Sequence, residues 1–341
     1  MSQCMEKYKN EFAIRFATVM QKRLPFWKSA QNQERLELVS LGSLGMYLVF
    51  FLLGFIPGKR EYNYDLNFHI FCAICMLIIG IITNIQNTNK NYQDRIKQTL
   101  FPDLLKVFGD EIYYGKLSII GVSEMIALGK ECKPSDLRIL NGDFLSSDLF
   151  KSKQITQRED DDCFWGRYND VDFAINETDF GYNAGRNNNY ARMFKGVAMH
   201  FKMNKKIKSR VLILSKKMGQ YVPPNYEKVN VEYDKFNKKY NVWVEKTRME
   251  AGGQIEARYL LTTVFLDRFM QISTSFNIDK VQCSIFDDSM LILLSTNKDL
   301  FEMNHLFGRI DDIHQYDHLF DEFASVLSFI DVLNLASKTG L

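Results

Sequence analysis

Residues 38–57 read LVSLGSLGMYLVFFLLGFIP, and residues 68–85 read FHIFCAICMLIIGIITNI. Neither stretch contains Asp, Glu, Lys or Arg. A helix needs roughly 20 apolar residues to span a bilayer and tolerates about 17, so both stretches are long enough. Only the ten residues 58–67 separate them, and helices joined by so short a link lie antiparallel. The two stretches therefore predict a transmembrane hairpin rather than a pair of core helices.

The orientation of this hairpin follows from the basic residues that flank it. Four Lys or Arg residues precede it, four follow it and two lie in its loop. They are Lys22, Arg23, Lys28 and Arg35; Lys90, Arg95, Lys97 and Lys106; and Lys59 and Arg60. Basic residues near membrane segments favour the cytoplasmic side, so both termini are expected in the cytoplasm. The sequence thus predicts a two-span protein of the cell membrane, with the lipid bilayer as a partner.

The N-terminal segment, residues 1–37, carries seven basic and four acidic side chains. Apolar residues recur at helical spacing from Tyr8 to Met20, which predicts an amphipathic helix over residues 5–23 that ends at Pro25. A basic amphipathic helix can lie on an anionic membrane surface or pack on a folded domain. The sequence leaves both alternatives open.

The remainder of the chain is predicted to contain a helical connector over residues 86–162 and a cytoplasmic domain over residues 163–341. Period-two alternation predicts strands, and apolar residues spaced by three and four predict two late helices. Asp287 and Asp288 are expected to form the turn of a hairpin. The fold class is therefore membrane-anchored α+β, with a mainly antiparallel sheet covered by helices. Strands are expected at 171–176, 191–203, 209–215 and 228–233, and helices at 257–272 and 313–333.

The charge balance excludes a basic nucleic-acid binder. The chain has 43 Lys and Arg against 41 Asp and Glu, a net charge of +2. One local region is basic, because seven of the 16 residues from Lys202 to Lys217 are Lys or Arg. Such a strand–turn–strand region can touch anionic lipid headgroups or a protein partner, although a solvated hairpin is the alternative. The candidate contact residues are Lys202, Lys205, Lys206, Lys208 and Arg210.

Several segments resemble a known family. They include RYNDVDFAIN from residue 167, RMFKGVAMHFKM from residue 192, and QIEARYLLTTVFLDRF from residue 254. Their order resembles that of the bacterial domain-of-unknown-function family three-one-three-seven. The resemblance covers roughly residues 85–335 and is best from Phe236 to Phe269, whereas the turn at Thr247–Gly253 departs from the family pattern. It implies a membrane-anchored cytoplasmic domain without assigned catalysis, and it supplies no catalytic residue.

No motif assigns a catalytic, cofactor-binding or metal-binding residue. His314 and His318 stand four residues apart, which is ligand-capable spacing, but a structural zinc site needs about four ligands. The acidic run Glu159–Asp162 lacks the pattern of a calcium loop and is typical of a solvated turn. The six cysteines are scattered and imply no disulfide framework. No cofactor is therefore expected.

These observations favour a non-catalytic, membrane-tethered interaction or scaffold module with an unidentified protein partner. The alternative is a membrane-bound hydrolase or ligand sensor with its site in the cytoplasmic domain. An enzyme requires convergent reactive side chains in one cleft. The residues whose convergence distinguishes the two are Cys163, His200, His314 and His318.

Overall fold

The computed structural model describes most of the chain. The described residues are 3–54, 93–109, 111–116, 139–151, 154–184, 189–217, 221–246, 257–298, 300–301, 309 and 311–338. The chain divides into two compact units. The first unit comprises residues 1–12, 105–301 and 316–341, and the second comprises residues 13–104 and 302–315.

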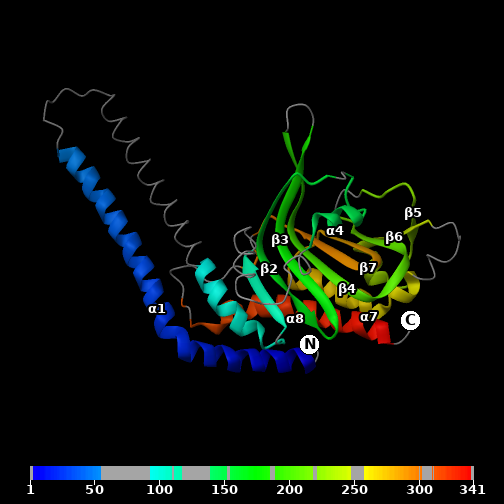
Figure 1. The fold of residues 1–341 in the computed structure, drawn as a ribbon, viewed down its shortest axis with the longest axis horizontal. Helices are drawn as coiled ribbons and strands as arrows, with labels where there is room; N and C mark the ends of the chain where they lie inside the picture. Colours follow the sequence, from blue (N-terminus) through cyan, green and yellow to red (C-terminus); the bar gives the residue numbers. More distant parts are fainter. Residues whose placement is uncertain are drawn as a thin grey trace. The chain divides into compact units, whose positions relative to one another are not determined.

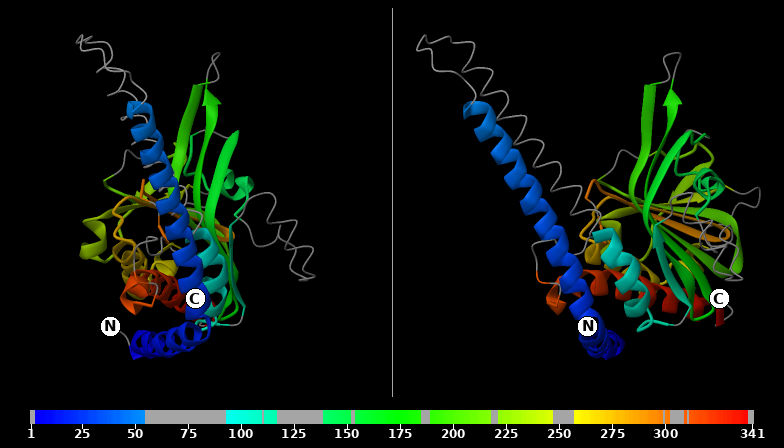
Figure 2. Two further views of the ribbon diagram at one scale, coloured as in Figure 1. Left: turned by 90° about the vertical axis from the view of Figure 1, so that its left-hand side faces the viewer. Right: turned by 60° about the vertical axis from the view of Figure 1, so that its left-hand side comes forward.

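The first unit is built on an antiparallel sheet of seven strands within the described residues (Figure 1). The strand order is β1-β2-β3-β4-β6-β5, and β7 also pairs with β4. The paired ends of β3 and β4 project from the rest of the sheet (Figure 2). The strands are β1 (Ile112–Lys116), β2 (Gln157–Tyr168), β3 (Val171–Ala184), β4 (Asn189–Ser215), β5 (Tyr226–Val229), β6 (Tyr240–Glu245) and β7 (Val281–Ser295).

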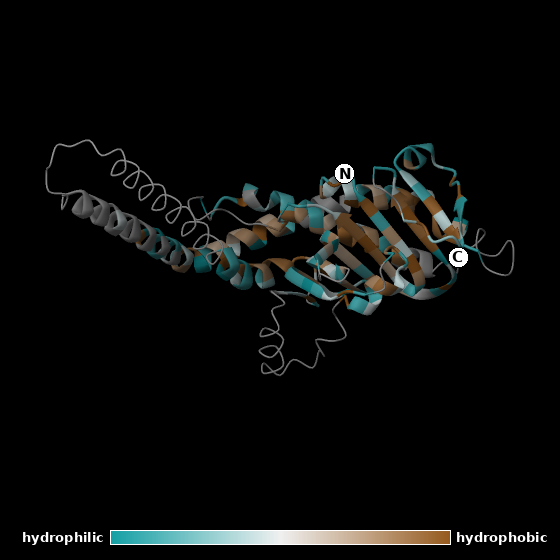
Figure 3. Ribbon diagram, turned by 90° about the horizontal axis from the view of Figure 1, so that it is seen from above, coloured by the Kyte–Doolittle hydropathy of each residue, from teal (hydrophilic) through white to brown (hydrophobic). Residues whose placement is uncertain are grey.

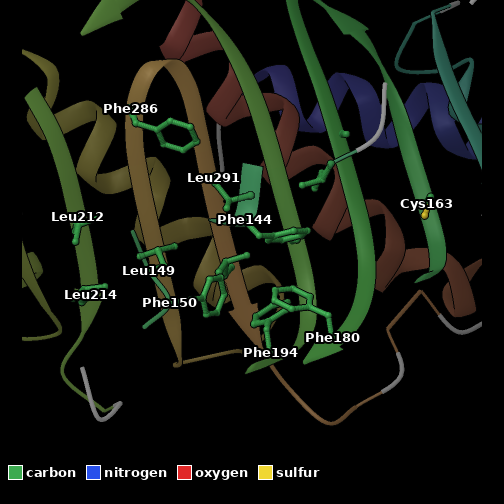
Figure 4. Close-up of a cluster of buried hydrophobic side chains, with 14 of the residues drawn as sticks. Phe144, Leu149, Phe150, Cys163, Phe180, Phe194, Leu212, Leu214, Phe286 and Leu291 are labelled. Atoms are coloured by element: carbon green, nitrogen blue, oxygen red, sulfur yellow. The ribbon is translucent and has the colours of Figure 1, made fainter. Parts of the chain in front are cut away.

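Two strands, β4 and β7, fold back on themselves. The β7 ribbon turns close to Phe286 (Figure 4). The next residue, Asp287, has a φ of +50°, and Ser295 N donates to Lys280 O at 2.9 Å. This confirms the predicted hairpin. The first arm of β4 pairs with the second arm of β7 (Gly196 opposite Ser295), and its second arm pairs with the first arm of β7 (Leu214 opposite Gln282). The two arms of β4 therefore flank the β7 hairpin rather than each other.

Helices cover both faces of this sheet (Figure 1). The short α4 lies on one face, while α7 and α8 lie on the other. This arrangement confirms the predicted α+β fold with an antiparallel sheet covered by helices. The helices are α1 (Gln3–Gly54), α4 (Asn141–Ser146), α5 (Asp234–Asn237), α7 (Thr263–Ser275) and α8 (Asp317–Lys338), with the 3₁₀ helix η2 (Ile313–Tyr316) and a helix over residues 93–105.

Each face of the sheet buries its own aromatic cluster, and hydrophobic residues follow the strands (Figure 3). On the α4 face, the Phe180 ring lies 4.5 Å from Phe144 and 5.6 Å from Phe194 (Figure 4). On the opposite face, Phe201 of β4 lies 5.6 Å from Phe329 of α8. Successive side chains of a strand point to opposite faces, so β4 contributes to both clusters.

The N-terminal helix α1 passes through Pro25, so the predicted end at this residue is wrong. An interior proline removes one backbone hydrogen bond and costs about 3 kcal/mol. Burial of Met20 and Trp27 on either side of it offsets this cost. In the first unit, the Phe12 ring lies 5.3 Å from Phe320 of α8, so the first turns of α1 pack on the folded domain.

The predicted membrane segments are only partly described. Residues 38–54 of the first segment form the last part of α1, and the second segment, residues 68–85, lies outside the described residues. Among the helices in the described part of the chain, none combines the length and the apolar character that a bilayer crossing requires. Within the predicted connector, residues 93–105 are helical, but β1 pairs with β2 and belongs to the sheet.

Candidate functional site

The five predicted contact residues lie where β4 passes around the tip of the β7 hairpin. Lys202 pairs in register with Ser289, and Ile207 pairs with Asp287, so the basic stretch encloses an acidic turn. Lys202 Nζ lies 2.8 Å from Asp288 Oδ1, and this hydrogen bond lowers the pKa of Asp288. Lys205 belongs to the same stretch of β4. Asp288, at the tip of the β7 hairpin, therefore balances part of the positive charge of this basic stretch.

Arg210, at the end of this stretch, holds residues 139–151, which we call the α4 segment. Its guanidinium donates to Ser146 O and to Asp148 Oδ2, both at 2.8 Å. Asp148 also accepts a hydrogen bond from the Tyr226 hydroxyl at 3.1 Å. Burial, together with the charge of Asp148, raises the pKa of Tyr226, so this phenol stays protonated and donates. Of the predicted contact residues, Arg210 thus has a structural role, whereas Lys206 and Lys208 are exposed.

A second arginine, Arg158 of β2, holds the other end of the α4 segment. Its Nη1 donates to Ile139 O at 2.7 Å and to Asn141 Oδ1 at 3.1 Å. Its Nε donates to Asp160 Oδ1 at 2.9 Å, and its guanidinium lies 5.0 Å from the centre of the Phe144 ring. Sequence reasoning missed both arginine anchors, because no local spacing signals contacts between residues so far apart in the chain.

Buried polar groups lie on the α4 face of the sheet. Asn176 Nδ2, Thr178 Oγ1 and His200 Nε2 are enclosed and have no hydrogen-bond partner among the described residues. In the pairing of β3 with β4, Thr178 lies opposite Gly196, Asn176 opposite Ala198, and His200 opposite Ala174, so each has a small cross-strand neighbour on that side. Burial lowers the pKa of His200, which keeps its imidazole neutral. These three atoms therefore keep unused hydrogen-bonding capacity inside the fold.

The residues that distinguish an enzyme from a binding module do not all converge. His200 points away from α8, because its neighbour Phe201 contacts Phe329 of that helix. His318 lies on α8, with its Nδ1 2.9 Å from Glu322 Oε1. Cys163 shares the face of His200 but lies on β2, with β3 between the two strands. His314, in the second unit, donates its backbone N–H to Asp312 Oδ1 at 3.1 Å.

The acidic run Glu159–Asp162 is not the predicted solvated turn, because it lies within β2. Asp162 is fully buried and accepts a hydrogen bond from the Tyr114 hydroxyl at 2.6 Å, while Asp160 pairs with Arg158. The strand is irregular between Asp160 and Cys163, and this irregularity allows successive acidic side chains to find partners. In the described part of the chain, no group of three or more His, Cys, Asp or Glu side chains is placed to hold a metal ion.

The buried carboxyl of Glu322 predicts a pH-dependent stability. Burial, together with the charges of Glu177 and Asp321, raises its pKa from 4.5 to about 8. The folded protein then holds a proton that the unfolded chain releases, so stability is lost as the pH rises from 4.5 to about 8. We expect Glu322→Gln to be more stable than the unsubstituted protein by about 2–4 kcal/mol at pH 9, with little difference near pH 4. Denaturant unfolding of the full chain at both pH values measures this.

The control for this experiment is Glu232→Gln, since Glu232 is exposed. This control should leave the pH dependence of unfolding unchanged. Parallel pH profiles for Glu322→Gln and the unsubstituted protein would show that the Glu322 carboxyl does not carry the effect.

The fold and its contacts define an α+β domain with an antiparallel sheet between α4 and the pair α7 and α8. Residues 192–335 match the family described as "Protein of unknown function (DUF3137)". This match confirms the predicted resemblance over these residues. No curated protein matches the chain. Among solved structures, the mycobacterial trehalose monomycolate transport factor A is similar at 8% sequence identity and a TM-score of 0.29, covering 57% of this chain and 92% of its own.

Proposed function

We propose that the protein is a non-catalytic interaction or scaffold module, tethered to the cell membrane by a two-helix hairpin with both termini in the cytoplasm. The observation that carries this proposal is the pair of uncharged runs in the sequence, of which the described part of α1 covers residues 38–54 without itself meeting the requirements of a span. This helix begins at Gln3 and runs to Gly54, so most of the uncharged run over residues 38–57 is helical. The second uncharged run, residues 68–85, is by its sequence long enough for the second span that the proposal requires.

The contact surface in this proposal is the basic stretch of β4. Lys206 and Lys208 are exposed there. Lys202 and Arg210 form ion pairs with Asp288 and Asp148. A cluster of exposed lysines attracts an anionic membrane surface or an acidic protein surface. The paired residues fix the backbone that presents these lysines.

A second candidate function is a ligand sensor, favoured by the enclosed polar groups beneath the α4 segment. Buried polar groups are normally hydrogen-bonded, so Asn176, Thr178 and His200 would gain partners from a small polar ligand. The α4 segment, held by Arg158 and Arg210, would be the element that responds to it. Ligand-dependent protection of residues 139–151 from hydrogen exchange would favour this function over the scaffold.

The membrane tether predicts a specific labelling pattern. A cysteine at position 63, in the loop between the two runs, should react with a membrane-impermeant maleimide in intact cells. A cysteine at the exposed position 228 of the sheet domain should react only after permeabilisation. The protein should also stay with the membrane pellet after an alkaline carbonate wash. Labelling is measured for the variants Asn63→Cys and Lys228→Cys.

The unsubstituted protein gives the background from the natural cysteines. Release of the protein by the carbonate wash would refute the tether. Equal labelling of both variants in intact cells would refute the proposed topology.

A further inference from the structure

A cleft with a volume of about 720 Å³ lies in the first unit, where the ends of β4 and β7 meet. Because both strands fold back on themselves, four strand ends lie side by side at this edge of the sheet. Among the described residues that line the cleft, five are basic and one, Asp279, is acidic. The basic residues are Arg192, Lys195, Lys217, Lys280 and Lys298.

Each strand end contributes positive charge to the cleft. Arg192 and Lys195 come from the start of β4, and Lys217 follows its end. Lys280 precedes β7, and Lys298 follows it. These strand ends are far apart in the sequence, so the pairing of β4 with β7 brings the five side chains together.

The carboxylates near the cleft do not balance this charge. Asp179 serves two cations, with its oxygens 3.0 Å from Arg192 Nε and 3.9 Å from Lys195 Nζ. Asp279 lies 2.6 Å from Lys217 Nζ, a hydrogen bond that lowers the pKa of this carboxyl. Lys280 and Lys298 form no ion pair with any described residue. Five cations therefore face two carboxylates, which leaves a net positive site.

The backbone beneath the cleft is fixed by hydrogen bonds. Thr296 N donates to Lys195 O at 3.0 Å, and Ser295 N donates to Lys280 O at 2.9 Å. The Ser215 hydroxyl donates to Asp279 O at 2.7 Å. Arg192 and Lys195 belong to β4, whereas Lys217, Lys280 and Lys298 lie one to three residues beyond a strand end. The hydrogen-bonded sheet thus restrains the backbone next to the basic side chains, and such preorganisation favours binding.

The geometry points to a binding site for a phosphate-bearing ligand in this cleft. A phosphate group carries up to two negative charges and several acceptor oxygens, which suit a site with one arginine and four lysines. The volume is within the range of small-molecule sites, so the ligand can extend beyond its phosphate. Met193, Phe194 and Ile278 give the cleft an apolar wall for that extension. This site is separate from the basic stretch of the proposed function and does not depend on the membrane tether.

The test uses the full chain purified in detergent and the double variant Lys280→Glu/Lys298→Glu. Two probes are titrated at constant ionic strength, namely glycerol 3-phosphate and lipid nanodiscs that contain phosphatidic acid. We expect saturable binding of at least one probe by the unsubstituted protein and a loss of tenfold or more in the double variant. Binding of the soluble probe identifies a free phosphate ester, whereas binding of the nanodiscs alone identifies a lipid headgroup.

The matched control is Lys228→Glu/Lys235→Glu, which makes the same change in net charge at exposed positions that do not line the cleft. It should bind like the unsubstituted protein. An equal loss in both double variants would overturn the proposal, because it would reveal only general electrostatic attraction. Binding of neither probe would also overturn it. Thermal unfolding of each variant shows whether its fold is intact. If Lys280→Glu/Lys298→Glu does not fold, Lys280→Gln/Lys298→Gln is tested in its place. This variant is also expected to lose binding.

Discussion

Replacement of Gly196 with alanine should destabilise the protein by about 3–5 kcal/mol, because no side chain fits at this position of the sheet. Gly196 has a φ of +142°, a conformation that residues with a Cβ rarely adopt. A Cβ placed there would lie 2.0 Å from Leu294 O and 2.9 Å from Thr296 N. Both contacts are with the backbone, so the clash can be relieved only by separating the first arm of β4 from β7. Thermal unfolding of the full chain should show a midpoint lower by on the order of 10 °C.

The control for this prediction is Gly142→Ala in α4. No atom lies within 4 Å of a Cβ built at Gly142, and its φ is not in the positive region. We expect its unfolding midpoint to stay the same or to rise slightly, since alanine favours a helix more than glycine does. If Gly196→Ala unfolded at the same temperature as Gly142→Ala, the close pairing of β4 and β7 at Gly196 would be wrong.

The sequence predicted most individual strands, because their signal is local. Residues 191–203 and 209–215 show the alternation of strands, and they are the two arms of β4. The Asp287–Asp288 turn was predicted from residues that tolerate a positive φ. The sequence did not predict which arms are neighbours. The sequence predicts a strand–turn–strand region from Lys202 to Lys217, but the β7 hairpin lies between the two arms of β4.

The candidate sites were harder to predict, because their residues meet only through strand pairing. The density of lysines from Lys202 to Arg210 was visible in the sequence, but the carboxylates that balance part of it come from Asp148 and Asp288. The residues of the basic cleft, in contrast, are spread from Arg192 to Lys298 without any local pattern. Only the register of β4 against β7 places their strand ends together.

The helix boundaries failed for a related reason. Proline at position 25 is a local signal for a helix end, but burial of Trp27 is a tertiary effect that outweighs it. Similarly, the predicted helix over residues 257–272 is interrupted at Leu261 and begins again after Thr262, whose hydroxyl accepts from Phe265 N at 3.3 Å. This cap starts α7, and the apolar spacing that continues across the break concealed it.

Phe180→Ala should destabilise the protein by about 3–5 kcal/mol and should also loosen the α4 segment. Phe180 is fully buried, and its ring lies 4.5 Å from Phe144 and 5.4 Å from Phe150. Both of these neighbours belong to the α4 segment, so Phe180 forms much of the surface on which that segment rests. Removal of the ring leaves a cavity directly beneath it. Hydrogen exchange of residues 139–151 should therefore accelerate beyond the change expected from global stability alone.

Phe323→Ala is the matched control, since it removes an equally buried phenylalanine from the opposite face of the sheet. The Phe323 ring lies 4.7 Å from Phe164, and α8 carries it. We expect a similar loss of global stability but no selective increase in the exchange of residues 139–151. Equal exchange of these residues in both variants would indicate that Arg158 and Arg210 hold the α4 segment without help from the aromatic cluster. A selective increase in Phe180→Ala would show that the segment can move while the sheet stays folded, as the sensor function requires.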